Sequence, residues 1–279
     1  MECYVTILSD DSLQSTLEKL GNVPIPPYFH REAEESDKEA YNTVYASGDG
    51  GSVAAPTAGL HFTDKVLQEI GTDNVSFLSL HVGAGTFKPV VSKDARNHEM
   101  HREVFSASVG EIRRVITALE EGKKPLMVVG TTSCRTLESL FWCGVKKLSG
   151  FETDSKNLNL DQFEWVPLSV GEGRHISRVT SLKALVEGLS DDDVLSGKTG
   201  LMIVPNRYEF KVVDHLVTNF HAPDSTLMLL VSAFLGGGDK VKSVYEVAQH
   251  KGYRFLSYGD VCMFSRPGAP KLGGGCRDE

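Results

Sequence analysis

The sequence lacks the features that mark secreted and membrane-spanning proteins. Its five cysteines, at positions 3, 134, 143, 262 and 276, contain no C-x-x-C pair and are odd in number, so we expect reduced thiols. The longest apolar stretch, 227–235, is interrupted by Ser232 and is too short to span a bilayer. The first residues, Met1-Glu2-Cys3-Tyr4, resemble neither a signal peptide nor a transit peptide. These absences predict a soluble cytoplasmic protein with no membrane partner.

The chain also lacks the excess of positive charge that marks many nucleic-acid-binding proteins. Its formal net charge of −8 argues against a nucleic-acid partner held by bulk electrostatics, although it leaves room for a local basic patch. A composition of 41% hydrophobic and 24% charged residues is ordinary for a globular protein. With 279 residues the chain is long enough to bury a substantial core.

The clearest local pattern lies at 213–238. Residues 213–221 alternate apolar and polar side chains, which predicts a strand, and Pro223 ends it. An apolar helix follows and stops at three glycines, 236–238. Asn219 and His221 would then lie where a strand ends and a buried helix begins, which is where α/β folds hold ligands. The alternative is a core strand with a structural histidine.

A second strand, turn and helix is predicted at 125–139. Thr131 and Thr132 fall at the start of the helix, with Arg135 one turn later. Hydroxyl groups and a guanidinium at a helix N-terminus favour an anion or carboxylate site. Ordinary helix capping would explain the hydroxyls but not the arginine. Cys134 is expected to be an inert helix residue.

The histidines near residue 100 form a third candidate. His98-Glu99-Met100-His101 is one residue short of the H-E-x-x-H zinc motif. If 100–106 is a strand, His101 and Glu103 share one face and form a proton-transfer pair. A surface ion pair is the alternative for these two residues, and a metal-dependent hydrolase built on His98 and His101 is an alternative function.

The remaining segments carry weaker signals. The G-A-G turn at 83–85 resembles the nucleotide-binding turn of methyltransferases, but an extended Lys88-Pro89 follows it where a helix is required. Residues 75–80 predict a buried strand, and the charge run 31–38 predicts a solvated face. Residues 144–200 are polar and rich in glycine, which indicates a surface insertion.

Six stretches resemble one family when they are taken in order. They are GSVAAPTAGLHFT (51–63), LHVGAGTFKPV (80–90), HEMHREVF (98–105), VGTTSCRTLES (129–139), FKVVDHLVTNFHAPDSTLMLLVSAFLG (210–236) and YRFLSYGD (253–260). The chain is similar along these blocks to the S-adenosylmethionine:tRNA ribosyltransferase-isomerases of queuosine biosynthesis. Six ordered blocks are more specific than any single motif above.

The resemblance implies an enzyme that uses S-adenosylmethionine as a ribosyl donor and needs no metal. The acceptor would be the 7-aminomethyl-7-deazaguanine base at the wobble position of a tRNA, and the products epoxyqueuosine-tRNA, adenine and methionine. The catalytic candidates are His101, oriented by Glu103, and His221, with Asp214 and Asp260 as orienting residues. The substrate-binding candidates are Ser52, Thr57, His81, Gly83, Thr131, Thr132, Arg135, Asn219 and Tyr258, of which Tyr258 would stack on a base.

The resemblance also implies a domain plan. We expect an α/β domain over 31–266, a mixed sheet flanked by helices, with the site at strand ends bearing His81, Thr131 and His221. Residues 1–30 would be the end of the family's inserted small β-barrel, most of which this chain lacks, and 267–279 a flexible tail. We expect a monomer. An N-terminally truncated chain leaves a second hypothesis, an inactive or binding-only relative that takes up S-adenosylmethionine or tRNA.

Overall fold

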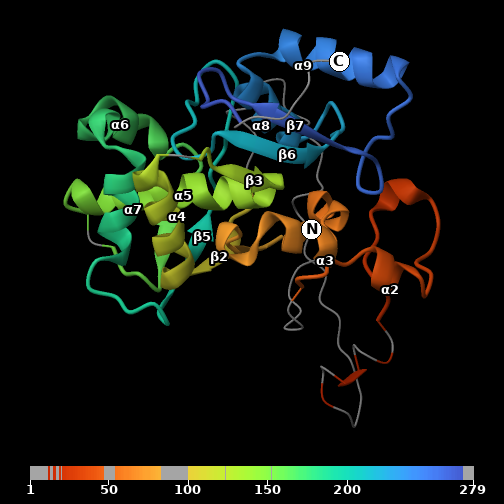
Figure 1. Cartoon of the computed structure of the whole chain (residues 1–279), viewed down its shortest axis with the longest axis horizontal. Helices are drawn as coiled ribbons and strands as arrows, with labels where there is room; N and C mark the ends of the chain where they lie inside the picture. The colour runs from red at the N-terminus through yellow and green to blue at the C-terminus, as the bar shows by residue number, and fades with distance from the viewer. Residues whose placement is uncertain are drawn as a thin grey trace.

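A computed structural model describes residues 12, 15–16, 19, 21–46, 54–82, 100–122, 124–151 and 153–272. Within these residues the strands form two sheets, one of four strands and one of three. The expected mixed α/β architecture with flanking helices is confirmed, but the expectation of a single sheet is wrong. Figure 1 shows α4, α5 and α7 gathered at one end of the molecule and α2 and α3 at the other.

The four-stranded sheet has the order β1 (Ser79–His81), β2 (Glu103–Ser108), β5 (Val194–Thr199), β4 (Leu158–Leu160). β2 pairs with β1 and β5 in antiparallel register, and β4 runs parallel to β5. In β2 the side chains of Glu103, Phe105 and Ala107 point into the core. β1 is a short edge strand whose Ser79 and His81 are exposed, so the expected buried strand at 75–80 is wrong.

The three-stranded sheet has the order β3 (Met127–Val129), β6 (His215–Asn219), β7 (Val261–Ser265). β3 is parallel to β6, and β7 is antiparallel to it. All five residues of β6 are buried, as expected for a central strand covered on both faces. The strand predicted near 213–221 therefore exists and is the middle of this sheet.

Helices flank the two sheets, and α4 and α8 begin at side-chain caps. α4 (Val109–Glu121) begins at Ser108, whose hydroxyl accepts a hydrogen bond from the Glu111 N–H at 3.1 Å. α8 (Thr226–Leu235) is capped in the same way by Ser225 and ends at Gly236 in a left-handed conformation. The remaining elements are α2 (Asp37–Ala40), α3 (Asp64–Ile70), α5 (Thr131–Leu148), α6 (Trp165–Val170), α7 (Arg178–Val186) and α9 (Gly238–His250), with short 3-10 helices η1 (Pro27–Phe29), η2 (Thr57–His61), η3 (Thr72–Asn74) and η6 (Glu172–His175).

The segment 144–200 belongs to the core, so its interpretation as a surface insertion is wrong. It supplies β5, the strand between β2 and β4, and α7, which packs against α4 and α5. Leu158, Leu160, Leu182 and Leu195 from this segment are among the largest fully buried side chains. No helix in the described ranges combines the length and apolarity needed to cross a bilayer.

Candidate functional site

The carboxyl ends of two neighbouring parallel strands bring distant candidates to one edge of the smaller sheet. Val129 of β3 pairs with Val217 of β6, and the Gly130 N–H donates to the Val217 carbonyl at 2.8 Å. Gly130 has φ +89, a conformation that glycine adopts without strain, and α5 begins at the next residue. Thr131 therefore follows β3 at the same edge where Asn219 ends β6.

Asn219 is held by a residue from a distant part of the sequence. The Thr57 hydroxyl, at the start of η2, donates a hydrogen bond of 2.7 Å to Asn219 Oδ1. Asn219 is 2% exposed, and within the described structure its Nδ2 has no hydrogen-bond partner. A buried donor without an acceptor costs free energy, so this amide is suited to an acceptor atom supplied by a ligand.

His221 lies just past the end of β6. Its Nε2 is 2.9 Å from the Thr218 hydroxyl, and its backbone N–H donates to the Tyr245 hydroxyl at 3.1 Å. Burial lowers the pKa of the imidazole to about 4. His221 is consequently neutral near pH 7, and burial opposes its protonation.

The loop 254–260 closes over the same end of β6. The Leu256 N–H donates to the Phe220 carbonyl at 2.9 Å, and Asp260 accepts from the Arg254 N–H at 2.8 Å. The Arg254 backbone and side chain hold the pKa of Asp260 below its usual value. Asp260 was expected to orient a catalytic histidine; its direct partner is Arg254.

A histidine that contacts this loop was missed by the sequence reasoning. His61 is exposed at the end of η2, and its Nε2 is 3.2 Å from the Gly259 carbonyl. Only its place in the 51–63 block, four residues after Thr57, signalled it. η2 therefore contacts β6 through Thr57 and the 254–260 loop through His61.

Tyr258 has a different environment from the expected one. Its hydroxyl donates to Asp37 at 2.8 Å, and its ring packs on Phe29 and Tyr41, with centroids 5.0 and 5.4 Å away. Phe29, Tyr41 and Asp37 hold the Tyr258 side chain in place, and its stacking on a base stays a prediction.

The environment of Asp37 differs from the solvated face expected for residues 31–38. It is 2% exposed and accepts two hydrogen bonds from Arg31, at 2.6 and 2.7 Å, so the run 31–38 is not wholly a solvated face. The Arg31 guanidinium, together with the Glu34 N–H, holds the pKa of Asp37 well below its usual range.

Glu103 does not orient His101. Its buried carboxylate forms an ion pair with Arg135 of α5, whereas His101 precedes β2 and is exposed. The proposed His101–Glu103 pair is wrong because β2 begins at Glu103 and turns this side chain into the core.

Arg135 is 5% exposed, and its Nε and Nη2 have no hydrogen-bond partner in the described structure. Two open donors on one guanidinium match a carboxylate or phosphate.

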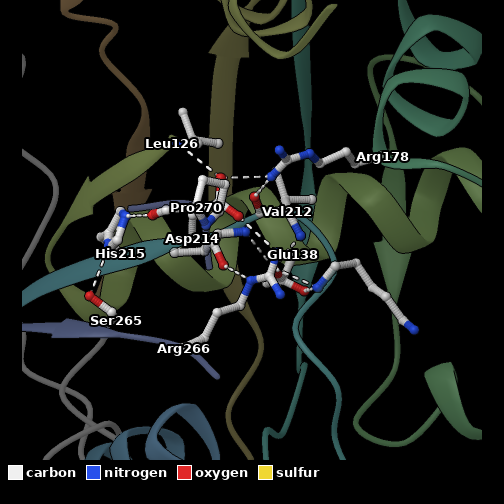
Figure 2. Close-up of polar contacts among 11 residues, drawn as sticks. Leu126, Glu138, Arg178, Val212, Asp214, His215, Ser265, Arg266 and Pro270 are labelled. Atoms are coloured by element: carbon white, nitrogen blue, oxygen red, sulfur yellow. Dashed lines mark hydrogen bonds and ion pairs between the residues drawn. The ribbon is translucent and has the colours of Figure 1, made fainter. Parts of the chain in front are cut away.

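Asp214 is a structural anchor rather than an orienting residue. Figure 2 shows it between Arg178 and Arg266, whose guanidinium groups lie 2.9 and 2.8 Å from its two oxygens. Burial raises the pKa of this carboxyl, but the Leu126 N–H and the arginines bring it below its usual value. Asp214 precedes β6 and His221 follows it, so the strand separates the two residues.

Beside Asp214 in Figure 2, His215 shows a second tether at the start of β6. Its Nδ1 lies 2.8 Å from the Ser265 hydroxyl and its Nε2 lies 3.1 Å from the Pro270 carbonyl. Both ring nitrogens of His215 therefore contact β7 or the residues that follow it. This imidazole is structural.

A model of the family described as "Queuosine biosynthesis protein" matches residues 2–264. The chain belongs to the queuosine biosynthesis family. The match includes η2, β6 and the 254–260 loop, so the elements that meet at the strand ends all lie inside the family region.

Two curated relatives in this family carry the name S-adenosylmethionine:tRNA ribosyltransferase-isomerase. The protein of Sulfurihydrogenibium sp. is 40% identical over 264 residues, which are 94% of this chain and 62% of that protein. The protein of Halothermothrix orenii is 40% identical over 256 residues, 91% and 60% of the two chains. The chain thus spans about three fifths of the length of these relatives.

Among solved structures, a crystal structure of an S-adenosylmethionine tRNA ribosyltransferase from Thermotoga maritima is similar. The identity is 29%, the TM-score is 0.44, and the alignment covers 74% of this chain and 50% of that one.

The family blocks place three histidine candidates on separate elements. His81 and His101 adjoin the four-stranded sheet, and His221 adjoins the other. Among the described residues, no hydrogen bond joins any two of these three histidines. Ser52, Gly83 and His98 lie outside the described residues. The part of the chain that the structure covers contains no group of three or more His, Cys, Asp or Glu residues placed to hold a metal ion.

Proposed function

We propose that this chain transfers the ribosyl group of S-adenosylmethionine to the 7-aminomethyl-7-deazaguanine base at the wobble position of a tRNA and isomerises it. The products would be epoxyqueuosine-tRNA, adenine and methionine. The observation that carries the proposal is the family match over 2–264, with relatives named S-adenosylmethionine:tRNA ribosyltransferase-isomerase. The reaction would take place in the cytoplasm on a monomer.

The reaction sets three physical requirements. A base must remove a proton from the carbon beside the sulfonium, whose positive charge makes that proton acidic. The departing adenine must receive a proton. The methionine carboxylate needs an electropositive contact in a site that excludes water. Each requirement has a candidate among the residues at the carboxyl edge of β3 and β6 and on the neighbouring elements.

Arg135, Thr131 and Thr132 are our candidates for the methionine carboxylate or a tRNA phosphate. The pairing of Glu103 with one arm of Arg135 fixes the guanidinium, and its Nε and Nη2 keep their hydrogen-bonding capacity. A fixed guanidinium loses little side-chain entropy when it binds an anion. The first-turn N–H groups of α5 add to the attraction for a negative group.

Asn219 is our candidate for an acceptor atom of the nucleoside. Thr57 occupies Oδ1 and thereby orients the amide, so that Nδ2 donates. An oriented donor discriminates strongly against a substrate that lacks the matching acceptor, because the amide then stays unpaired. His81 remains a candidate for the same pocket and His101 a candidate proton-transfer residue that acts without Glu103.

The test is adenine release by the purified chain. The chain is incubated with S-adenosylmethionine and a tRNA that carries 7-aminomethyl-7-deazaguanine, and adenine is measured by chromatography. The matched control is the same tRNA with guanine at the wobble position. Adenine from the modified tRNA alone supports the proposal.

Two other outcomes would replace it. Binding of S-adenosylmethionine or tRNA without adenine release supports a binding-only relative. Release that is abolished by a chelator and restored by a divalent metal would contradict the metal-independent chemistry proposed here.

A further inference from the structure

The loop 254–260 is held in a conformation that costs free energy. Leu256 has φ +69, a left-handed conformation that side chains rarely adopt. The loop keeps this shape because the Leu256 N–H donates to the Phe220 carbonyl and Asp260 binds both the backbone and the guanidinium of Arg254, at 2.8 and 3.0 Å. Strain fixed by several contacts points to a functional purpose for what the loop presents.

What the loop presents is the Gly259 carbonyl, directed at His61. A side chain at 259 would come within 2.5 Å of the Arg254 and Phe255 backbone, so the close approach requires glycine. The carbonyl can only accept, so His61 Nε2 carries the hydrogen of their 3.2 Å contact. In the neutral ring the lone pair is then on Nδ1. His61 is exposed, and no described residue forms a hydrogen bond with its Nδ1.

His61 also lies close enough to a carboxylate for their charges to interact. Asp260 follows Gly259 directly and is influenced electrostatically by His61. His221 has a different environment, because its side-chain partner is the uncharged Thr218 hydroxyl and burial lowers its pKa.

We propose that His61 is the catalytic residue that takes the proton from the carbon beside the sulfonium, an assignment that rests on the proposed function. Nδ1 accepts the proton, and the electron pair of the C–H bond stays on the carbon. The pair forms a double bond to the neighbouring ring carbon as the bond from that carbon to the ring oxygen breaks. The ring oxygen then forms a carbonyl with the carbon that carried adenine, and adenine leaves with the electrons of its bond to that carbon. The imidazolium then returns its proton to the adenine nitrogen. The ring ends neutral, and no further reactant is consumed in this step.

The position of His61 agrees with this role. It shares the five-residue element η2 with Thr57, which orients the open amide of Asn219. One short helix therefore carries both the residue that would set the nucleoside contact and the residue that would move the proton.

The experiment compares two variants with the unaltered chain in the adenine-release assay on modified tRNA. His61→Gln keeps an N–H that can donate to the Gly259 carbonyl but has no basic lone pair. His61→Ala leaves space for added imidazole. His250→Gln, on α9, is the matched control, because one of its ring nitrogens likewise contacts a backbone carbonyl, that of Glu246. Circular dichroism and affinity for S-adenosylmethionine are measured for each.

We expect both His61 variants to fold and to bind S-adenosylmethionine within about threefold of the unaltered chain, while adenine release falls at least about 100-fold, in the range of general-base catalysis. Millimolar imidazole should restore part of the rate in His61→Ala and none in His61→Gln. Normal release by His61→Gln, or no rescue of a folded His61→Ala, would overturn the role of His61 alone. No release by the unaltered chain would overturn the proposed function and this assignment together.

Discussion

Thr57 and Asn219, 162 residues apart in the sequence, are joined by a hydrogen bond of 2.7 Å that leaves the Asn219 Nδ2 without a partner in the described structure. The bond fixes which end of the amide faces away from Thr57. It therefore converts a side chain that can turn either way into an oriented donor.

Removal of this hydroxyl should weaken both folding and binding. Thr57→Val keeps the shape of the side chain but leaves Asn219 Oδ1 buried without a donor, which costs about 1–3 kcal/mol of unfolding free energy. We expect the affinity for S-adenosylmethionine to fall about tenfold, the effect of one lost neutral hydrogen bond. Urea unfolding and isothermal titration calorimetry measure the two effects. Thr57→Ser keeps the hydroxyl and should behave like the unaltered chain; equal affinity in both variants would contradict the orienting role.

The buried Glu103–Arg135 pair should be sensitive to loss of one charge. Glu103→Gln leaves the guanidinium charged in the core, so we expect a loss of about 3–5 kcal/mol of unfolding free energy. The control is Asp161→Asn, which removes a charge from the exposed Arg102–Asp161 pair and should cost less than about 1 kcal/mol. Similar losses in the two variants, measured by urea unfolding, would show that Arg135 is not held by this carboxylate.

His221 should make the fold sensitive to mild acid. Its pKa is lowered from 6.5 to about 4, so the unfolded chain binds a proton at pH values where the folded chain does not. Stability therefore falls as the pH falls from about 6.5 towards 4, by up to about 2 kcal/mol at pH 5 from this group. His221→Gln removes the titrating group. The difference in unfolding free energy between pH 7 and pH 5 should shrink in that variant, and an unchanged difference would refute the assignment.

Gly197 tests whether 144–200 is part of the core. A Cβ at 197 would lie 1.9 Å from the Leu158 carbonyl oxygen in the neighbouring strand, so Gly197→Ala must push β4 and β5 apart. We expect a loss of about 3 kcal/mol or more. At Gly200, three residues later, the nearest atom to a Cβ would be 3.5 Å away, and Gly200→Ala should cost much less. Equal melting temperatures for Gly197→Ala and Gly200→Ala would contradict the tight packing of this segment in the core.

Local patterns in the sequence were sufficient to predict an element when the signal lies within the residues of that element. The alternation before Pro223 and the apolar run that stops at glycines 236–238 each predicted an element that the structure contains. β5 was not predicted because its buried positions are Leu195, Gly197 and Thr199, so the face that it turns to the core is not made of large apolar residues.

Partners far apart in sequence could not be predicted from one chain. Asp214 was expected from the family resemblance to orient a catalytic histidine, but its partners, Arg178 and Arg266, come from 36 residues before and 52 residues after it. His61 was overlooked for the same reason, because its significance depends on the Gly259 carbonyl, 198 residues away. Binding geometry of this kind is a property of the tertiary structure.

The hydrogen bond between Tyr258 and Asp37 makes the shape of one surface loop dependent on a segment 221 positions earlier. An engineer who grafts residues 254–260 from a relative into this chain would therefore have to transfer the surroundings of Asp37 as well. Chimaeras that exchange only residues 254–260 should lose the position of the Gly259 carbonyl. Chimaeras that also exchange the surroundings of Asp37 should keep it.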